Sequence, residues 1–214
     1  MNRSETVAKI LLDLKAVTFN PKQPYKYASG IVSPVYTDCR VVISSPEKRT
    51  QIINFYLEVI KESGLEFDVV AGTATAGIPH AAWIADRLNK PMAYVRGKAK
   101  DHGKENTVEG ALQPGQKVII IEDLVSTGDS SINSFHAIKA AGGEASHVFS
   151  IMKYGLQKGE DNFKENGLSL VSLTDFQTIL KVAKNNRDLT DEEVAIIEDW
   201  LKDPQGWGKR QGHE

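Results

Sequence analysis

Residues 118–131 read VIIIEDLVSTGDSS, and this stretch decides the fold. It opens with a run of β-branched residues, which favours a buried β-strand over 117–121. Two adjacent acids, Glu122 and Asp123, follow at once and predict the end of that strand. Small hydroxyl residues around Gly128 come next and precede a helical pattern. A strand, a polar loop and a helix in this order are typical of one unit of an α/β protein.

The same alternation of strands and helices extends on both sides of this stretch. Apolar segments predict strands at 67–71, 92–95, 117–121 and 147–152, with an edge strand at 168–173. Helical spacing predicts helices at 4–17, 46–63, 79–89, 130–141 and 190–202, the first of them capped by Ser4. Residues 25–43 predict short strands or a hairpin. We therefore expect an α/β fold with a central, mostly parallel sheet that is flanked by helices.

The composition limits the classes of protein to which this chain can belong. Of its 214 residues, 41% are hydrophobic and 25% are charged, which suits one globular domain. The net charge of -2 supplies no basic field, so we expect no nucleic acid as a partner. The sequence has no apolar run of about 18 residues, so we expect no membrane span. A single cysteine, Cys39, fits a reducing cytosol and a cytoplasmic location.

Three polar loops are expected at the carboxyl ends of the strands, where open α/β sheets bind their ligands. They are residues 72–77, 96–103 and 122–131. Small residues in the third loop let backbone N–H groups approach a phosphate, and the following helix adds positive potential. Glu122 and Asp123 would repel a phosphate beside them and suit hydroxyl groups, a metal ion or developing positive charge. A sugar phosphate meets both requirements.

This third loop and its strand resemble the phosphoribosyl-diphosphate (PRPP) signature of type I phosphoribosyltransferases. That signature is an apolar strand, two acids, two apolar residues and a Thr/Ser-Gly phosphate loop. The resemblance implies PRPP contacts from Glu122, Asp123, Leu124, Val125, Ser126, Thr127, Gly128, Asp129 and Ser130, with Asp123 also catalytic. The signature identifies the superfamily but not the base that is ribosylated.

A second motif, RGKAKDHG at 96–103, concentrates cations that can neutralise a diphosphate. Its pattern resembles the mobile catalytic loop of orotate phosphoribosyltransferases. The resemblance implies that Arg96, Lys100 and His102 bind the diphosphate of PRPP, with Lys100 catalytic. It also implies a homodimer in which a lid loop, 96–110, completes the site of the neighbouring subunit. The lid and a small N-terminal hood complete the fold that this family implies.

A third motif, SGIVSPVYTD at 29–38, resembles the segment that covers the pyrimidine site in the same family. The resemblance implies that orotate contacts Tyr36 and Thr37 from this segment and Ser126 from the phosphate loop. Some relatives hold the orotate carboxylate with an arginine after the last core strand. This chain has Lys153 in that region, which we expect to act there as a point charge.

These motifs together imply transfer of the 5-phosphoribosyl group of PRPP to N1 of orotate. The products would be orotidine 5′-monophosphate and diphosphate, as in the synthesis of UMP. We expect Mg²⁺ as cofactor, held mainly by PRPP and water and without direct protein ligands. We expect one domain over 1–214, with a hood at roughly 1–45, a core at roughly 46–160 and a C-terminal extension at roughly 174–214.

Two other functions share part of the pattern. A purine phosphoribosyltransferase carries the PRPP signature, but should not carry both AKDHG and SPVYTD. A PRPP-sensing regulator keeps the signature as well, but should show a basic face or an added segment that binds DNA. The distinction therefore depends on the second and third motifs and not on the stretch that decides the fold.

Overall fold

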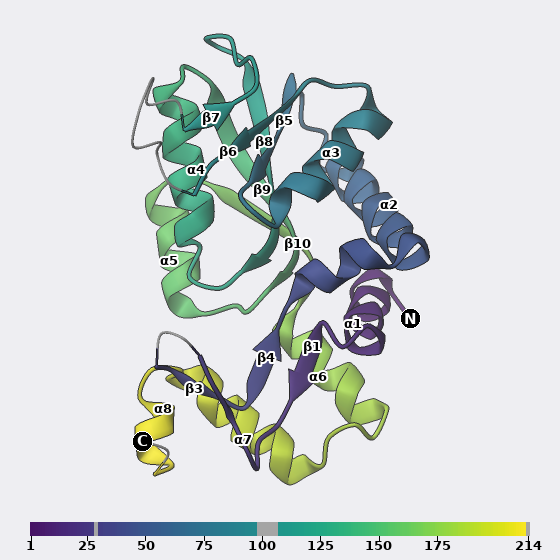
Figure 1. Cartoon of the computed structure of the whole chain (residues 1–214), viewed down its shortest axis with the longest axis vertical. Helices are drawn as coiled ribbons and strands as arrows, with labels where there is room; N and C mark the ends of the chain where they lie inside the picture. The colour runs from purple at the N-terminus through teal and green to yellow at the C-terminus, as the bar shows by residue number, and fades with distance from the viewer. Residues whose placement is uncertain (28–29, 98–106, 213–214) are drawn as a thin grey trace.

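A six-stranded sheet forms the centre of the computed structural model, which describes residues 1–27, 30–97 and 107–212. Its strand order is β10-β9-β8-β5-β6-β7, as Figure 1 allows the reader to follow. The strands are β5 (Val69–Thr73), β6 (Met92–Val95), β7 (Val108–Glu109), β8 (Lys117–Val125), β9 (Glu144–Lys153) and β10 (Ser169–Asp175). Neighbours are parallel except for β7, which runs antiparallel to β6. The expected mostly parallel sheet, with β10 at its edge, is confirmed.

Helices cover both faces of this sheet, and β8 shows why. Ile119 and Ile121 point to one hydrophobic cluster, whereas Val118 and Ile120 point to another on the opposite face. A strand that is buried on both faces needs apolar residues at every position. The helices are α1 (Arg3–Asp13), α2 (Pro46–Glu62), α3 (Gly77–Leu88), α4 (Asp129–Ala140), α5 (Gln157–Glu165), α6 (Phe176–Asn185), α7 (Asp191–Lys202) and α8 (Trp207–Arg210). The first cluster includes residues of α1, α2, α3 and α6, and the second includes residues of α4 and α5 (Figure 1).

Four short strands form the N-terminal hood beside the main sheet. β1 (Val17–Phe19) pairs with β4 (Val35–Thr37), and β2 (Tyr25–Lys26) pairs with β3 (Val32–Ser33), both antiparallel. The hairpin expected within 25–43 is confirmed, but its last part forms a 3₁₀ helix, η1 (Cys39–Ser44). In Figure 1, α7 and α8 lie alongside these strands. The C-terminal segment is therefore packed against the beginning of the chain.

Several sequence-based boundaries are wrong, among them the end of the first helix, which is at Asp13 and not at residue 17, because Val17 begins β1. The strand predicted to end at residue 121 continues to Val125, because Glu122 pairs with Ser150 of the equally long β9. The first helix is capped by Asn2 and not by Ser4, because the Asn2 side chain accepts the N–H of Glu5 at 2.9 Å. The Glu5 side chain in turn accepts the N–H of Asn2, which completes a capping box. The sequence analysis also missed α5.

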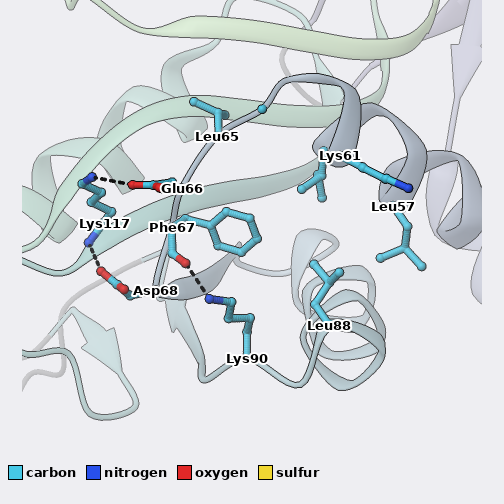
Figure 2. Close-up of a pocket in the computed structure, with 11 residues that line it drawn as sticks. Leu57, Lys61, Leu65, Glu66, Phe67, Asp68, Leu88, Lys90 and Lys117 are labelled. Carbon is cyan, nitrogen blue, oxygen red and sulfur yellow. Dashed lines mark hydrogen bonds and ion pairs between the residues drawn. The ribbon is translucent and has the colours of Figure 1, made fainter.

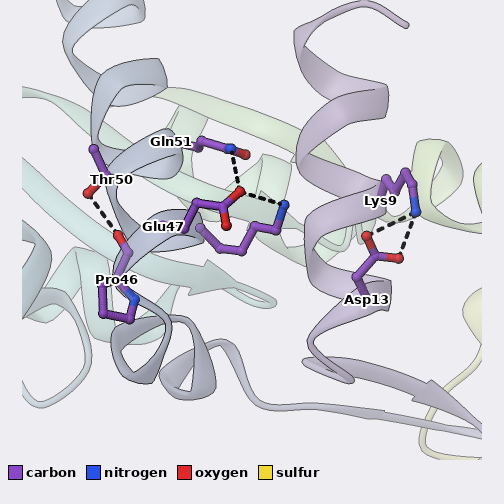
Figure 3. A network of polar contacts seen from close by, with 7 residues as sticks. Lys9, Asp13, Pro46, Glu47, Thr50 and Gln51 are labelled. Atoms are coloured by element: carbon purple, nitrogen blue, oxygen red, sulfur yellow. Dashed lines mark hydrogen bonds and ion pairs between the residues drawn. The ribbon is translucent and has the colours of Figure 1, made fainter.

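The outer faces of α1 and α2 carry short-range polar contacts (Figure 3). Lys9 Nζ lies 2.8 Å from Asp13 one turn further along α1. On α2, Gln51 Nε2 donates to Glu47 Oε1 at 3.3 Å. Exposed pairs of this kind stabilise a helix by only about 0.2–0.5 kcal/mol each. They identify the solvent side of these helices, and the opposite side is packed in the core.

The amino ends of β5 and β8 border an open pocket of about 820 Å³ (Figure 2), which we call the amino-end pocket. Its lining comprises Leu57, Ile60, Lys61, Gly64, Leu65, Glu66, Phe67, Asp68, Leu88, Lys90 and Lys117. Lys90 Nζ donates to the Phe67 carbonyl at 2.8 Å, and the Lys117 N–H donates to Asp68 at 2.9 Å.

Among the described residues, no helix is long and apolar enough to cross a membrane.

Candidate functional site

Glu122 and Asp123, which we call the acid pair, lie in the carboxyl half of β8. The Glu122 side chain is 4% exposed and accepts the hydroxyl of Ser130 at 2.9 Å. Its other oxygen accepts the N–H of Asp123 at 3.2 Å. The hydroxyl of the buried Tyr56 donates to the Glu122 carbonyl at 2.7 Å. The side chain of Glu122 is thus buried and fixed by hydrogen bonds at the carboxyl end of β8, whereas Asp123 is partly exposed.

The acid pair has unusual electrostatics for two neighbouring carboxyl groups. Burial, followed by repulsion from Asp123, raises the pKa of Glu122 to about 8. Burial is also the main cause that raises the pKa of Asp123, and the positive charge of Arg40 acts in the opposite direction. Two carboxyl groups in such a place disfavour their charged forms until a positive charge or hydroxyl donors approach. This edge therefore suits a ligand that brings one of these.

The segment Ser126–Ser130, which was predicted to bind phosphate and is called the phosphate loop below, joins β8 to the first turn of α4, and its shape is fixed by contacts from α5. Asn162 of α5 donates to the Thr127 carbonyl at 2.8 Å and to Asp129 at 3.2 Å. Gly128 has a φ of +82°, and a Cβ there would lie 2.7 Å from the ring of Phe163. Helix α4 begins at the next residue, so the loop presents the amino end of a helix. Such an arrangement binds phosphate groups readily.

The neighbouring predicted residues differ in how far they can reach a ligand. The Val125 side chain is 3% exposed, and Leu124 packs partly against the main core. Only the backbone of Val125 can therefore reach a ligand, whereas the side chain of Leu124 is partly exposed. Ser126 is exposed, and its carbonyl passes so close to Gly159 that a Cβ there would lie 2.6 Å from the oxygen. Asn162 and Gly159 were both missed, because α5 was missed.

Two more loops reach the same edge of the sheet. The loop after β5 leads into Gly77, where an added Cβ would collide with the Ile121 carbonyl just before the acid pair. At the end of β6, Arg96 donates through Nη1 to Glu109 of β7 at 3.1 Å. Its guanidinium is therefore held by the edge strand. Lys100 and His102, the other predicted cations, lie outside the described residues.

The residues predicted to contact orotate come from the hood and from the carboxyl ends of two strands. Tyr36 is 41% exposed, and its ring centroid lies 5.6 Å from that of Tyr25. Lys153 ends β9 opposite Val125 of β8, and it lines a pocket of about 240 Å³ with Ser126. The remaining hood residue, Thr37, is hydrogen-bonded at 2.8 Å to the hydroxyl of Tyr154. Tyr154 was not predicted, since its partner lies 117 residues away in the sequence.

Comparison with known proteins gives the chain a family context. Residues 43–181 match the family model of the phosphoribosyl transferase domain. The chain is 47% identical to an orotate phosphoribosyltransferase of Listeria monocytogenes over 209 residues, which cover 98% of this chain and 100% of that protein. It is 46% identical to an orotate phosphoribosyltransferase of Coxiella burnetii, with 97% of this chain and 99% of that protein covered.

A solved structure is also similar. The crystal structure of orotate phosphoribosyltransferase from Aeropyrum pernix superposes with a TM-score of 0.73 at 31% sequence identity. The match covers 82% of this chain and 96% of that chain.

Proposed function

The chain belongs to the phosphoribosyl transferase domain family, and we propose that it is an orotate phosphoribosyltransferase of pyrimidine biosynthesis. It transfers the 5-phosphoribosyl group of PRPP to N1 of orotate, which gives orotidine 5′-monophosphate and diphosphate. The observation that carries this conclusion is the full-length similarity to orotate phosphoribosyltransferases. The acid pair, directly followed by a phosphate loop at the amino end of α4, supports the use of PRPP.

We propose that the phosphate loop and the acid pair, at the carboxyl end of β8, bind the 5-phosphate and the ribose of PRPP. The phosphate loop would bind the 5-phosphate through backbone N–H groups and hydroxyls. Asp123 and Glu122 would bind the ribose hydroxyls and favour positive charge on the ring. Breaking the bond from C1 to diphosphate leaves an oxocarbenium-like ring, and its developing positive charge is stabilised by a nearby carboxylate. The raised pKa of Glu122 supports this role, because a buried carboxyl there gains most from a positive neighbour.

The leaving diphosphate needs positive charge, which we assign to Arg96, Lys100 and His102. Mg²⁺ usually binds substrate phosphates and retains several waters. Among the described residues, no group of three or more His, Cys, Asp or Glu side chains could hold a metal ion. We therefore propose that PRPP and water supply most ligands of Mg²⁺, which would neutralise charge on the departing diphosphate.

The acceptor site would combine the hood with the ends of β8 and β9. Tyr36 and Thr37 of the hood would contact the pyrimidine ring, and Ser126 would approach it from the phosphate loop. Lys153 would attract the orotate carboxylate as a point charge. The position of Lys153 opposite Val125, beside Ser126, supports this assignment.

We also propose one domain and a cytoplasmic location. Side chains of α6, α7 and α8 belong to the same hydrophobic cluster as α1 and α2, which supports a single domain. The single, buried Cys39 supports a reducing compartment.

A homodimer with shared sites is a further part of the proposal, and mixing inactive variants tests it. If the lid 96–110 serves the neighbouring subunit, Lys100→Ala and Asp123→Ala subunits should regain activity when mixed. Each mixed dimer would contain one site with both residues intact. When equal amounts of the two variants pair at random, about half of the dimers are mixed, so we expect the mixture to show roughly a quarter of the wild-type activity. Turnover after confirmed subunit exchange is the measurement. Exchange without recovered activity would mean that each lid serves its own subunit.

The activity itself is tested by mixing the protein with orotate, PRPP and Mg²⁺. We expect loss of the ultraviolet absorbance of orotate, with release of one diphosphate per orotate consumed. Omission of PRPP or Mg²⁺ is the control. Turnover of hypoxanthine or adenine in place of orotate would instead identify a purine enzyme.

A further inference from the structure

We infer that Tyr154 is a positioning residue that sets the distance between the two sides of the orotate site. This inference rests on the proposed function. Tyr154 directly follows β9, and its hydroxyl lies 2.8 Å from the Thr37 hydroxyl of the hood. Thr37 lies in the two-stranded sheet of the hood and Tyr154 directly follows a strand of the main sheet, so this bond joins the hood to the core at the point where the acceptor would bind.

On the core side, Tyr154 is attached to the strand that carries the acid pair. Its backbone N–H donates to the Val125 carbonyl at 2.9 Å. Val125 is followed by Ser126, and Tyr154 is preceded by Lys153. Both core residues assigned to orotate are therefore direct neighbours of this backbone bond. A shift of Tyr154 would move them relative to the hood.

On the hood side, the bond reaches a strand that is itself well fixed. Thr37 is the last residue of β4 and pairs with Val17 of β1. The following N–H, that of Asp38, donates to the Ala16 carbonyl at 2.7 Å. The Tyr154 hydroxyl thus holds an ordered strand end and not a loose loop. Tyr36, the exposed aromatic residue assigned to orotate, directly precedes Thr37.

The ring of Tyr154 is packed so that its hydroxyl has little freedom. Its centroid lies 5.0 Å from that of Phe176 in a stacked arrangement and 5.9 Å from that of Trp200 in an edge arrangement. Tyr154 is 8% exposed, and burial raises the pKa of its phenol, which therefore stays neutral and can donate. The aromatic packing fixes the ring, and the hydroxyl transmits that position to Thr37.

Removal of the hydroxyl alone tests the inference. Tyr154→Phe keeps the stacked ring but loses the bond to Thr37. We expect the KM for orotate to rise roughly fivefold, the scale of one hydrogen bond, while the KM for PRPP and kcat stay within about twofold. Adding Tyr154→Phe to Thr37→Val should raise the KM for orotate less than Tyr154→Phe does alone, because only the contact of the hydroxyl with Tyr27 of the hood is then left to lose.

Ser4→Ala is the matched control. The Ser4 hydroxyl lies 3.0 Å from the Thr174 hydroxyl, so this variant also removes one hydrogen bond between the N-terminal segment and the main sheet, but on α1. We expect a similar small loss of thermal stability in both variants and an unchanged KM for orotate only in Ser4→Ala.

Three outcomes would overturn the inference. They are an unchanged KM for orotate in Tyr154→Phe, an equal rise in the KM values of orotate and PRPP, and a loss of stability without a kinetic effect. Wild-type protein that fails to consume orotate would instead overturn the proposed function. The two failures are thus separated by the wild-type measurement.

Discussion

The two ends of the central sheet differ in chemistry more than in size. The amino-end pocket, at about 820 Å³, is somewhat larger than the two pockets of about 240 and 640 Å³ that Lys153 lines at the carboxyl end. Yet most of its charged groups already have partners in the protein. Lys117 lies 3.7 Å from Glu66, and Lys90 donates to a backbone carbonyl. This pocket has room for a ligand, but binding a ligand there would stabilise few of its charged side chains.

The carboxyl end has the opposite character. Glu122 and Asp123 are neighbours in a strand, and burial raises the pKa of both. This arrangement destabilises the folded protein at neutral pH, because ionising buried carboxyl groups costs free energy. A cationic transition state would be stabilised by the same groups. We therefore propose that the unfavourable burial of two carboxyl groups, and not the volume of a cavity, marks the end of the sheet that binds the substrates.

The largest expected difference is between two variants that each replace one aspartate, one at either end of the sheet. Asp123→Asn removes the partly exposed carboxylate at the carboxyl end, and we expect kcat to fall by at least about 10²-fold, the scale of one preorganised charge-stabilising group. Asp68→Asn is the matched change at the amino end. Its side chain accepts the Lys117 N–H, which an asparagine oxygen can also accept, so we expect kcat within about twofold of wild type.

Steady-state rates with orotate and PRPP measure both variants. A large loss of kcat in Asp68→Asn with retained thermal stability would show that the amino end takes part in function and would break the comparison. Retained kcat in Asp123→Asn would remove this residue from the mechanism.

A glycine at each end gives the second test. Gly128 and Gly64 both have positive φ, but a Cβ at Gly128 meets the Phe163 ring at 2.7 Å, whereas nothing lies within 4 Å at Gly64. Left-handed strain costs a non-glycine residue about 1–2 kcal/mol, and forced overpacking costs about 1–3 kcal/mol more. We expect Gly128→Ala to lower the free energy of unfolding by about 2–5 kcal/mol and Gly64→Ala by about 1–2 kcal/mol.

Urea unfolding measures these losses of stability. The KM for PRPP is a second measurement that distinguishes the variant at the carboxyl end from the variant at the amino end. We expect the KM for PRPP to rise only in Gly128→Ala, because only that glycine belongs to the phosphate loop. Equal losses of stability would mean that Phe163 moves aside, and a normal KM for PRPP would contradict the role of the loop.

The sequence predicts the order of strand, acid pair, loop and helix around residues 117–141, because each of these features is local. The run of β-branched residues, the acid pair and the phosphate loop are contiguous, and the helix that follows begins at Asp129, one residue from its predicted start. The end of β8 was wrong because strand length depends on pairing with β9, which adjacent residues do not encode.

Contacts across long sequence separations could not be predicted. Asn162 fixes the phosphate loop from 35 residues away, and its short helix α5 carries only two buried residues. Tyr154 meets Thr37 only after the hood folds against the core. The buried orientation of the Glu122 side chain also depends on the hydrogen bond from Ser130, eight residues further along the chain. Local patterns therefore predict the chemistry of this site, and tertiary packing determines its geometry.

The smallest expected effect is a dependence of stability on pH that arises at the carboxyl end. The ordinary pKa of Glu122 is 4.5 and its folded value is about 8, so the folded protein binds more protons between these values. The free energy of unfolding should therefore fall as the pH rises through this window. His80 acts in the opposite direction up to 6.5, because burial lowers its pKa from 6.5 to about 4.

The contribution of His80, and that of His147, whose pKa is also lowered by burial, fades within about one pH unit above 6.5, so the difference between wild type and Glu122→Gln over pH 6.5 to 8 isolates Glu122. Each unit of pH changes the free energy by at most about 1.4 kcal/mol per group, so we expect a fall of about 2 kcal/mol over this window. Glu122→Gln keeps the size of the side chain but cannot ionise, and it should flatten most of the slope. A slope that survives in Glu122→Gln would place its source outside this carboxyl, and the electrostatic contrast between the two ends of the sheet would then lose its main support.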